Sequence, residues 1–154
     1  MDSEIRDSAR TSGQFLELAR RFRDAAILLE EHRPKRKADG HAPVRFWRLH
    51  AISLHLGAFL LSKGKPYERI RGCGHDVSTL AELARAEGLT LRQKTREHLS
   101  ITWDQREHRE TRYPPLTSSG FLPPAAVEAA LRDLEKKDSE ALHEEKRAPE
   151  GASS

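Results

Sequence analysis

Apolar positions are densest between residues 44 and 64, and their spacing predicts a buried α-helix. They recur at intervals of three and four residues, as on one face of a helix; this face holds Trp47, Ala51, Leu54, Ala58 and Leu61. Further aliphatic residues widen the face until little of the helix is polar, so it needs neighbours on most sides. The stretch is shorter than a membrane span and carries charged residues. It therefore predicts the centre of a soluble helical bundle.

Other segments predict further helices, and no alternation typical of strands persists along the chain. A helix over 12–31 has the inward stripe Phe15, Leu16, Ala19, Phe22, Ala26 and Leu29. A third helix is expected between the cap Asp76 and the terminator Gly88, and a fourth over 91–109. A fifth follows Pro124, with Val127, Ala130, Leu131 and Leu134 facing inward. The pattern predicts an all-α fold.

The ends of the chain are polar, which sets the expected domain boundaries. Residues 1–11 predict a flexible N-terminus, 12–136 the helical domain, and 137–154 a polar, disordered tail that begins with a frayed helix. A chain of 154 residues fits one domain of this kind.

Composition and charge restrict the function classes only slightly. The net charge of +3 and the pI of about 9.2 are mildly basic and do not by themselves indicate nucleic acid. The single cysteine, Cys73, excludes an intramolecular disulfide. The charged N-terminus lacks the apolar core of a signal peptide, and no long apolar run predicts a membrane span. The expected location is the cytoplasm.

Residues 50–89 contain several short motifs that follow one another in a set order. The predicted central helix ends in the sequence LLSKG, and after a short linker comes the turn Gly74-His75-Asp76, followed by a helix that closes on Gly-Leu. Farther along, Arg112-Tyr113-Pro114 follows the fourth predicted helix. In these features the chain resembles the HEPN domain family.

The resemblance implies an up-and-down bundle of four to five helices, frequently a homodimer, that needs no metal and no cofactor. HEPN proteins often occur in bacterial toxin–antitoxin, phage-defence and RNA-processing settings, beside partner genes. Some are metal-independent ribonucleases with an Arg-x4-6-His motif, and others bind RNA or protein without catalysis. This chain departs from the family at Ser53 and Gly57, where relatives commonly carry a Glu and a Lys.

Arg–His pairs with the ribonuclease spacing are the candidate catalytic residues. The reaction needs a His to exchange a proton with RNA and an Arg to stabilise charge on the phosphorus centre. Arg69 with His75 and Arg92 with His98 are the best-placed pairs. Similar pairs arise by chance elsewhere in an Arg-rich chain with eight histidines. His75 also has a structural interpretation, because an imidazole beside a helix cap can hold the turn.

Basic residues on the second and fourth predicted helices are candidates for nucleic-acid binding, with Tyr113 available for base stacking. They are Arg45, Arg48, Arg96, Arg106, Arg109 and Arg112. The alternative is a solvated helical surface on which acidic residues balance the cations. No spacing typical of a metal site occurs, so no metal is expected.

The leading hypothesis is a dimeric, HEPN-like helical module that binds RNA or a protein partner and is non-catalytic or weakly catalytic. The alternatives are a metal-independent ribonuclease and a purely structural interaction domain.

Overall fold

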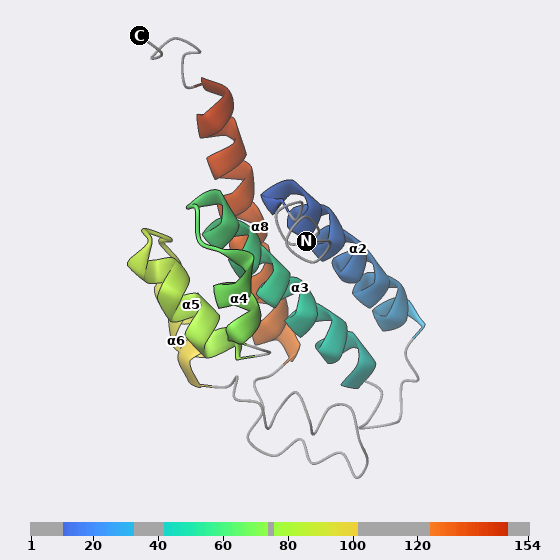
Figure 1. Ribbon diagram of the computed structural model, residues 1–154. Helices are drawn as coiled ribbons and strands as arrows, with labels where there is room; N and C mark the ends of the chain where they lie inside the picture. Colours follow the sequence, from blue (N-terminus) through green and yellow to red (C-terminus); the bar gives the residue numbers. More distant parts are fainter. Residues whose placement is uncertain (1–10, 33–41, 74–75, 102–123, 148–154) are drawn as a thin grey trace, which may run out of the picture.

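The computed structural model describes residues 11–32, 42–73, 76–101 and 124–147 as six helices, with no strand in these ranges (Figure 1). The helices are α2 (Ser12–Glu31), α3 (Ala42–Ser62), α4 (Tyr67–Gly72), α5 (Val77–Ala86), α6 (Gln93–Ile101) and α8 (Pro124–Arg147). They pack as an all-α helical bundle, which confirms the predicted fold class.

Helix α3 lies at the centre of the bundle, as its apolar pattern predicts. It contacts α2, α4, α5 and α8, and the side chains of Ile52, Leu56 and Leu60 are fully buried. Trp47 and Leu61, at the ends of the predicted face, are half-buried. None of the described helices is long and apolar enough to cross a membrane.

Helix α2 covers one side of α3 and runs antiparallel to it (Figure 1). The ring of Phe22 stacks on Trp47 at a centroid distance of 4.8 Å. Leu16, Ala19 and Ala26 face inward as predicted. Leu29 was also expected to face inward, but 37% of its surface is exposed.

Gly57 has a structural role in this contact. A Cβ at this position would lie 2.9 Å from Cε2 and 3.0 Å from Cδ2 of Phe15, so the glycine lets the ring of α2 pack directly on the α3 backbone. The ring of Phe15 in turn meets the ring of Tyr67 edge to face, at 6.2 Å. The absence of a side chain at 57 is therefore explained by helix packing.

Local sequence signals set the helix ends. Gly64 and Gly88 have φ of +79° and +100°, the left-handed conformation that glycine adopts without strain. At each end an amide reaches back across the turn to a helix carbonyl, Lys65 to Leu60 and Leu89 to Ala84, both at 3.0 Å. These contacts turn the chain sharply after α3 and after α5.

The N-terminal caps also follow the sequence. Asp76 accepts a hydrogen bond from the backbone N–H of Thr79 at 3.1 Å, as expected for the cap of α5. Thr11 and Gln14 form a reciprocal capping box that starts α2.

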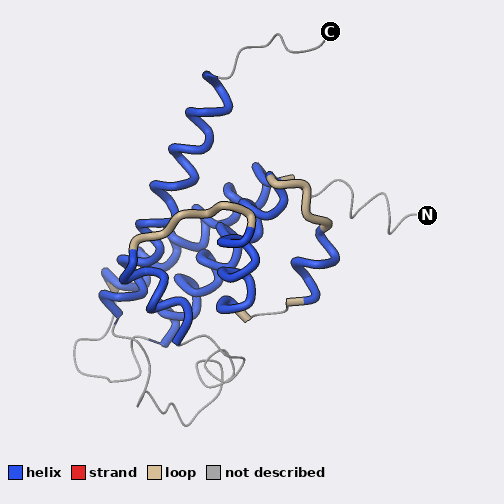
Figure 2. Tube along the Cα trace, turned by 90° about the vertical axis from the view of Figure 1, so that its left-hand side faces the viewer, coloured by secondary structure: helices blue, strands red, loops and turns tan. Residues whose placement is uncertain are grey.

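The last two helices differ partly from expectation. Helix α6 begins at Gln93, two residues after the predicted start, and is described to Ile101; positions 102–109 of the predicted helix lie outside the described residues. On α8 the four predicted inward residues are buried. This helix continues to Arg147, beyond the domain boundary expected at 136, and its C-terminal part projects past the other helices (Figures 1 and 2).

Candidate functional site

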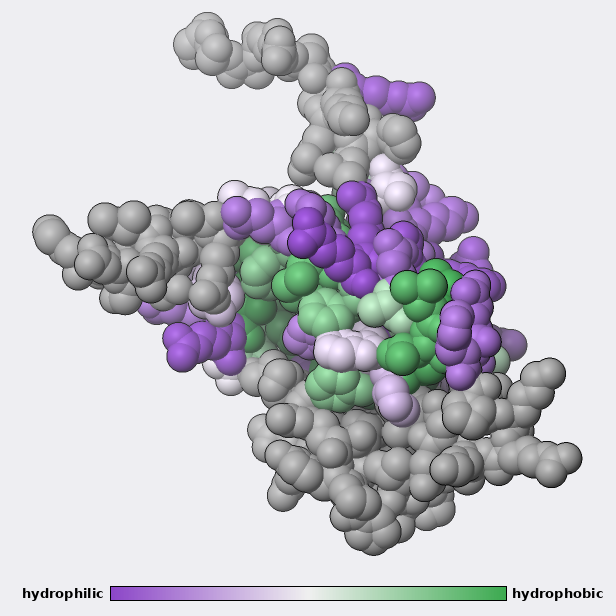
Figure 3. Space-filling view, turned by 90° about the vertical axis from the view of Figure 1, so that its right-hand side faces the viewer, coloured by the Kyte–Doolittle hydropathy of each residue, from purple (hydrophilic) through white to green (hydrophobic). Residues whose placement is uncertain are grey.

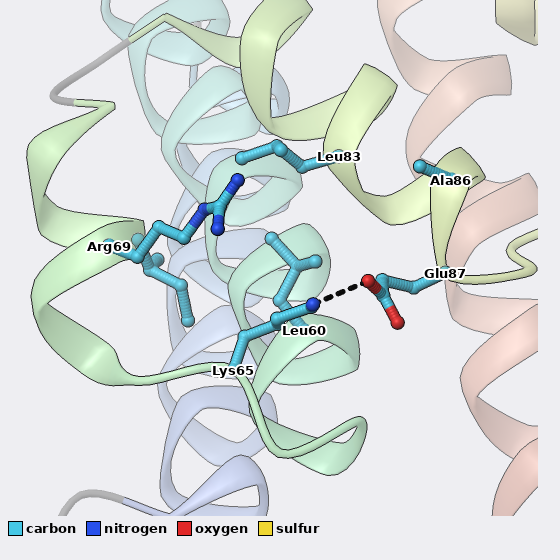
Figure 4. Close-up of a pocket in the computed structure, with 7 residues that line it drawn as sticks. Leu60, Lys65, Arg69, Leu83, Ala86 and Glu87 are labelled. Carbon is cyan, nitrogen blue, oxygen red and sulfur yellow. Dashed lines mark ion pairs between the residues drawn. The ribbon is translucent and has the colours of Figure 1, made fainter.

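A hollow of about 110 Å³ lies where the end of α3, α4 and the end of α5 meet (Figure 4). Its apolar lining consists of Leu60, Ile70, Leu83 and Ala86. Three charged side chains, Lys65, Arg69 and Glu87, complete it. The turns at Gly64 and Gly88 place Lys65 and Glu87 opposite each other, since both residues adjoin a left-handed glycine.

The charged residues of the hollow carry a net positive charge. Lys65 Nζ lies 2.6 Å from Glu87 Oε1, and this ion pair spans one side of the hollow. The Arg69 guanidinium extends from α4 toward the side chain of Leu83 (Figure 4). No carboxylate in the described ranges forms an ion pair with Arg69. Among the described residues, Lys65 is thus paired with a carboxylate and Arg69 is not.

Of the candidate pair Arg69 and His75, the structure describes Arg69, and His75 lies outside the described residues. Near Arg69, the Cys73 thiol donates to the Arg69 carbonyl oxygen at 3.4 Å. Burial raises the pKa of this thiol and nearby Asp76 raises it further, against a smaller opposing effect of Arg69. The thiol is therefore held protonated, the opposite of what an activated nucleophile needs.

In the second candidate pair, Arg92 and His98, the arginine contacts Asp133 on α8. The Arg92 backbone N–H donates to Asp133 Oδ2 at 3.0 Å, and the side-chain Nε of Arg92 lies 3.5 Å from Asp133 Oδ1. Asp133, on α8, is only 3% exposed. His98 is half-buried on α6. Arg92 therefore ties the start of α6 to α8, which is a structural role.

Arg45 and Arg48, two of the residues predicted to bind nucleic acid, are buried. Each is 7% exposed, and Arg48 Nη2 lies 3.9 Å from Glu128 Oε2 on α8. In this arrangement Arg48 lies beside a carboxylate of α8, and neither arginine is exposed. Arg96 is exposed on α6. Four further candidates lie outside the described residues: Arg106, Arg109, Arg112 and Tyr113.

A buried polar pair between α3 and α8 was missed by sequence reasoning. His55, 2% exposed, forms a hydrogen bond through Nδ1 to Asp138 Oδ2. Its Nε2 is also buried and has no hydrogen-bond partner among the described residues. The only sequence signal was a histidine at an inward position of an apolar helix. The partner, 83 positions away, was in the predicted tail.

Four large aliphatic side chains of α2 are exposed. They are Leu18, Ile27, Leu28 and Leu29, which are 37% to 60% exposed and lie on more than one side of the helix, since Ile27 is about 180° from Leu18 around the axis. In the view of the molecule's α2 side, apolar surface lies open beside charged residues (Figure 3). Leu18 and Leu29 share one side of the helix, about 20° apart around its axis, and contiguous exposed apolar groups are typical of interaction sites.

Metal binding has no support in the described residues, where no group of three His, Cys, Asp or Glu side chains could hold an ion. The sequence matches no protein-family model, no curated protein and no solved structure.

Proposed function

We propose that this chain is a HEPN-like helical binding module with no catalytic activity, and that its partner is a protein. The observation that carries the proposal is the exposure of large aliphatic side chains on α2, of which Leu28 exposes 60% of its surface. Interfaces of protein complexes bury such groups and gain the free energy of removing them from water. The family resemblance adds a partner encoded beside this gene, in a defence or toxin–antitoxin setting, and a homodimer.

Two observations favour a protein partner over RNA. The burial of Arg45 and Arg48 removes two of the cations expected to meet phosphates. The cations of α2 are balanced by acidic neighbours, as in the pairs Arg21–Glu17 and Arg23–Asp24. A surface with aliphatic groups and both signs of charge suits a protein better than a phosphate backbone.

RNA binding remains the second candidate, because Lys94 and Arg96 are exposed on α6. These residues allow a crossed experiment with two double variants of the full chain, L18S/L28S and K94S/R96S. Each immobilised protein is incubated with a lysate of its native host, and the captured proteins are identified by quantitative mass spectrometry. The same proteins are tested for RNA binding by gel shift at low and high salt.

The proposal expects L18S/L28S to lose a specific captured protein that wild type and K94S/R96S both retain. Capture that is equal for all three proteins would contradict it. A salt-sensitive RNA shift lost only in K94S/R96S would favour RNA instead.

The ribonuclease alternative is tested by incubating wild type with RNA in EDTA, beside H75A and H98A. We expect no cleavage by any of the three. Cleavage by wild type that either variant abolishes would establish the enzyme. Light scattering of the purified chain tests the proposed homodimer.

A further inference from the structure

The size of the hollow between α4 and α5 limits what it can hold. Sites for small-molecule ligands usually enclose about 300–1,000 Å³. A dry apolar cavity of about 150 Å³ holds one benzene molecule. The hollow, at about 110 Å³, is smaller than either and has room for one branched aliphatic group. Its occupant is therefore one side chain of a larger molecule that stays mostly outside.

The charges of the hollow determine which aliphatic group fits best. Lys65 and Arg69 contribute two positive charges and Glu87 one negative charge, next to the apolar side chains of Leu60 and Leu83. Because Glu87 already pairs with Lys65, the guanidinium of Arg69 is left to bind an anion. A guanidinium binds a carboxylate through two parallel hydrogen bonds. The complementary ligand has an aliphatic group with a carboxylate close beside it.

We propose that the hollow binds the C-terminal residue of a partner protein, a Leu or Val with its free α-carboxylate. The aliphatic side chain enters the hollow, and the α-carboxylate binds Arg69. This inference rests on the proposed function, a protein-binding module, and specifies one contact of the partner.

A chain terminus fits better than an internal acidic residue for a geometric reason. In a C-terminal Leu or Val, the carboxylate and the side chain are attached to the same Cα. In the interior of a chain the carboxylate belongs to a neighbouring residue at the end of its own side chain, and ordering it costs additional conformational entropy. Because the hollow holds a single side chain, it binds the aliphatic group and the carboxylate together only when both are attached to one residue.

The minimal ligand is N-acetyl-L-leucine, and its matched control is N-acetyl-L-leucinamide, which lacks the charge. Each is titrated into the full-length protein and followed by ¹H–¹⁵N NMR. The acid is expected to shift the amide signals of Leu60, Ile70 and Leu83 in a saturable manner, at millimolar concentrations. The amide is expected to bind about fivefold more weakly, because it loses the contact with Arg69. Absent shifts, or equal binding of acid and amide, would overturn the proposal.

Three variants identify the residues responsible. R69Q is expected to bind acid and amide equally weakly, whereas R71Q, which changes an exposed arginine of the same helix outside the hollow, is expected to bind like wild type. E87Q removes the negative charge and frees Lys65, so it is expected to bind the acid about threefold more tightly. A role of these residues in folding alone would not produce tighter binding. Weaker acid binding by E87Q, or the same loss in R71Q as in R69Q, would overturn the assignment.

This titration can fail independently of the proposed function. Partner capture that depends on Leu18 and Leu28 of α2, without binding of N-acetyl-L-leucine, would leave the binding module in place and remove the hollow as its contact site.

Discussion

Replacing Gly57 with Ala is expected to destabilise the protein, although alanine is the better helix former. In a helix interior the change from Gly to Ala gains about 1 kcal/mol. Here the new Cβ would lie 2.9 Å and 3.0 Å from two carbons of the Phe15 ring, so the ring or α2 must move. Overpacking of this kind costs about 1–3 kcal/mol. We expect the free energy of unfolding of G57A to fall by about 1 kcal/mol.

The assay is urea unfolding followed by far-UV circular dichroism, with four proteins forming a double-mutant cycle. In an F15A background the ring is absent, so G57A is expected to stabilise by about 1 kcal/mol, the helix propensity alone. Gly13 provides the control, because a Cβ there would meet only Thr11 Oγ1 at 3.9 Å, and G13A should not destabilise. A G57A protein more stable than wild type, or no change of sign in the F15A background, would refute the packing argument.

The remaining predictions concern buried polar groups and the thiol. D138A leaves the buried imidazole of His55 without its hydrogen bond and is expected to lower the free energy of unfolding by about 1–3 kcal/mol, measured by urea unfolding; an unchanged midpoint would contradict it. D133A removes the acceptor that fixes the start of α6, so hydrogen exchange should accelerate in α6 more than in α2; uniform acceleration would exclude this local role. Burial and Asp76 raise the pKa of Cys73, so iodoacetamide should alkylate it at about pH 8 more slowly than in the urea-unfolded chain. D76N keeps a capping oxygen and removes the charge, so it should speed this alkylation; an unchanged rate would show that burial acts alone.

The sequence by itself determined the helices and most of their ends. The signals for these features lie within a few residues of each other: the apolar spacing of α3, the cap at Asp76, and the left-handed glycines at 64 and 88. Helix hydrogen bonds join residues four apart, so a local pattern contains the information that such bonds require. The inward residues of α8 were predicted for the same reason, because an amphipathic stripe shows which side of a helix is buried.

The tertiary structure alone decided which polar residues of different helices meet and which stay exposed. Arg48 and Arg96 look alike in the sequence, but α8 packs over the first and leaves the second in water. His55 meets Asp138 across 83 positions, and Asp133 meets Arg92 across 41. Such pairs depend on which helix faces come together, and many pairings satisfy the same periodicity. The hollow beside Arg69 likewise exists only because three helix ends converge, so no segment of the sequence encodes it alone.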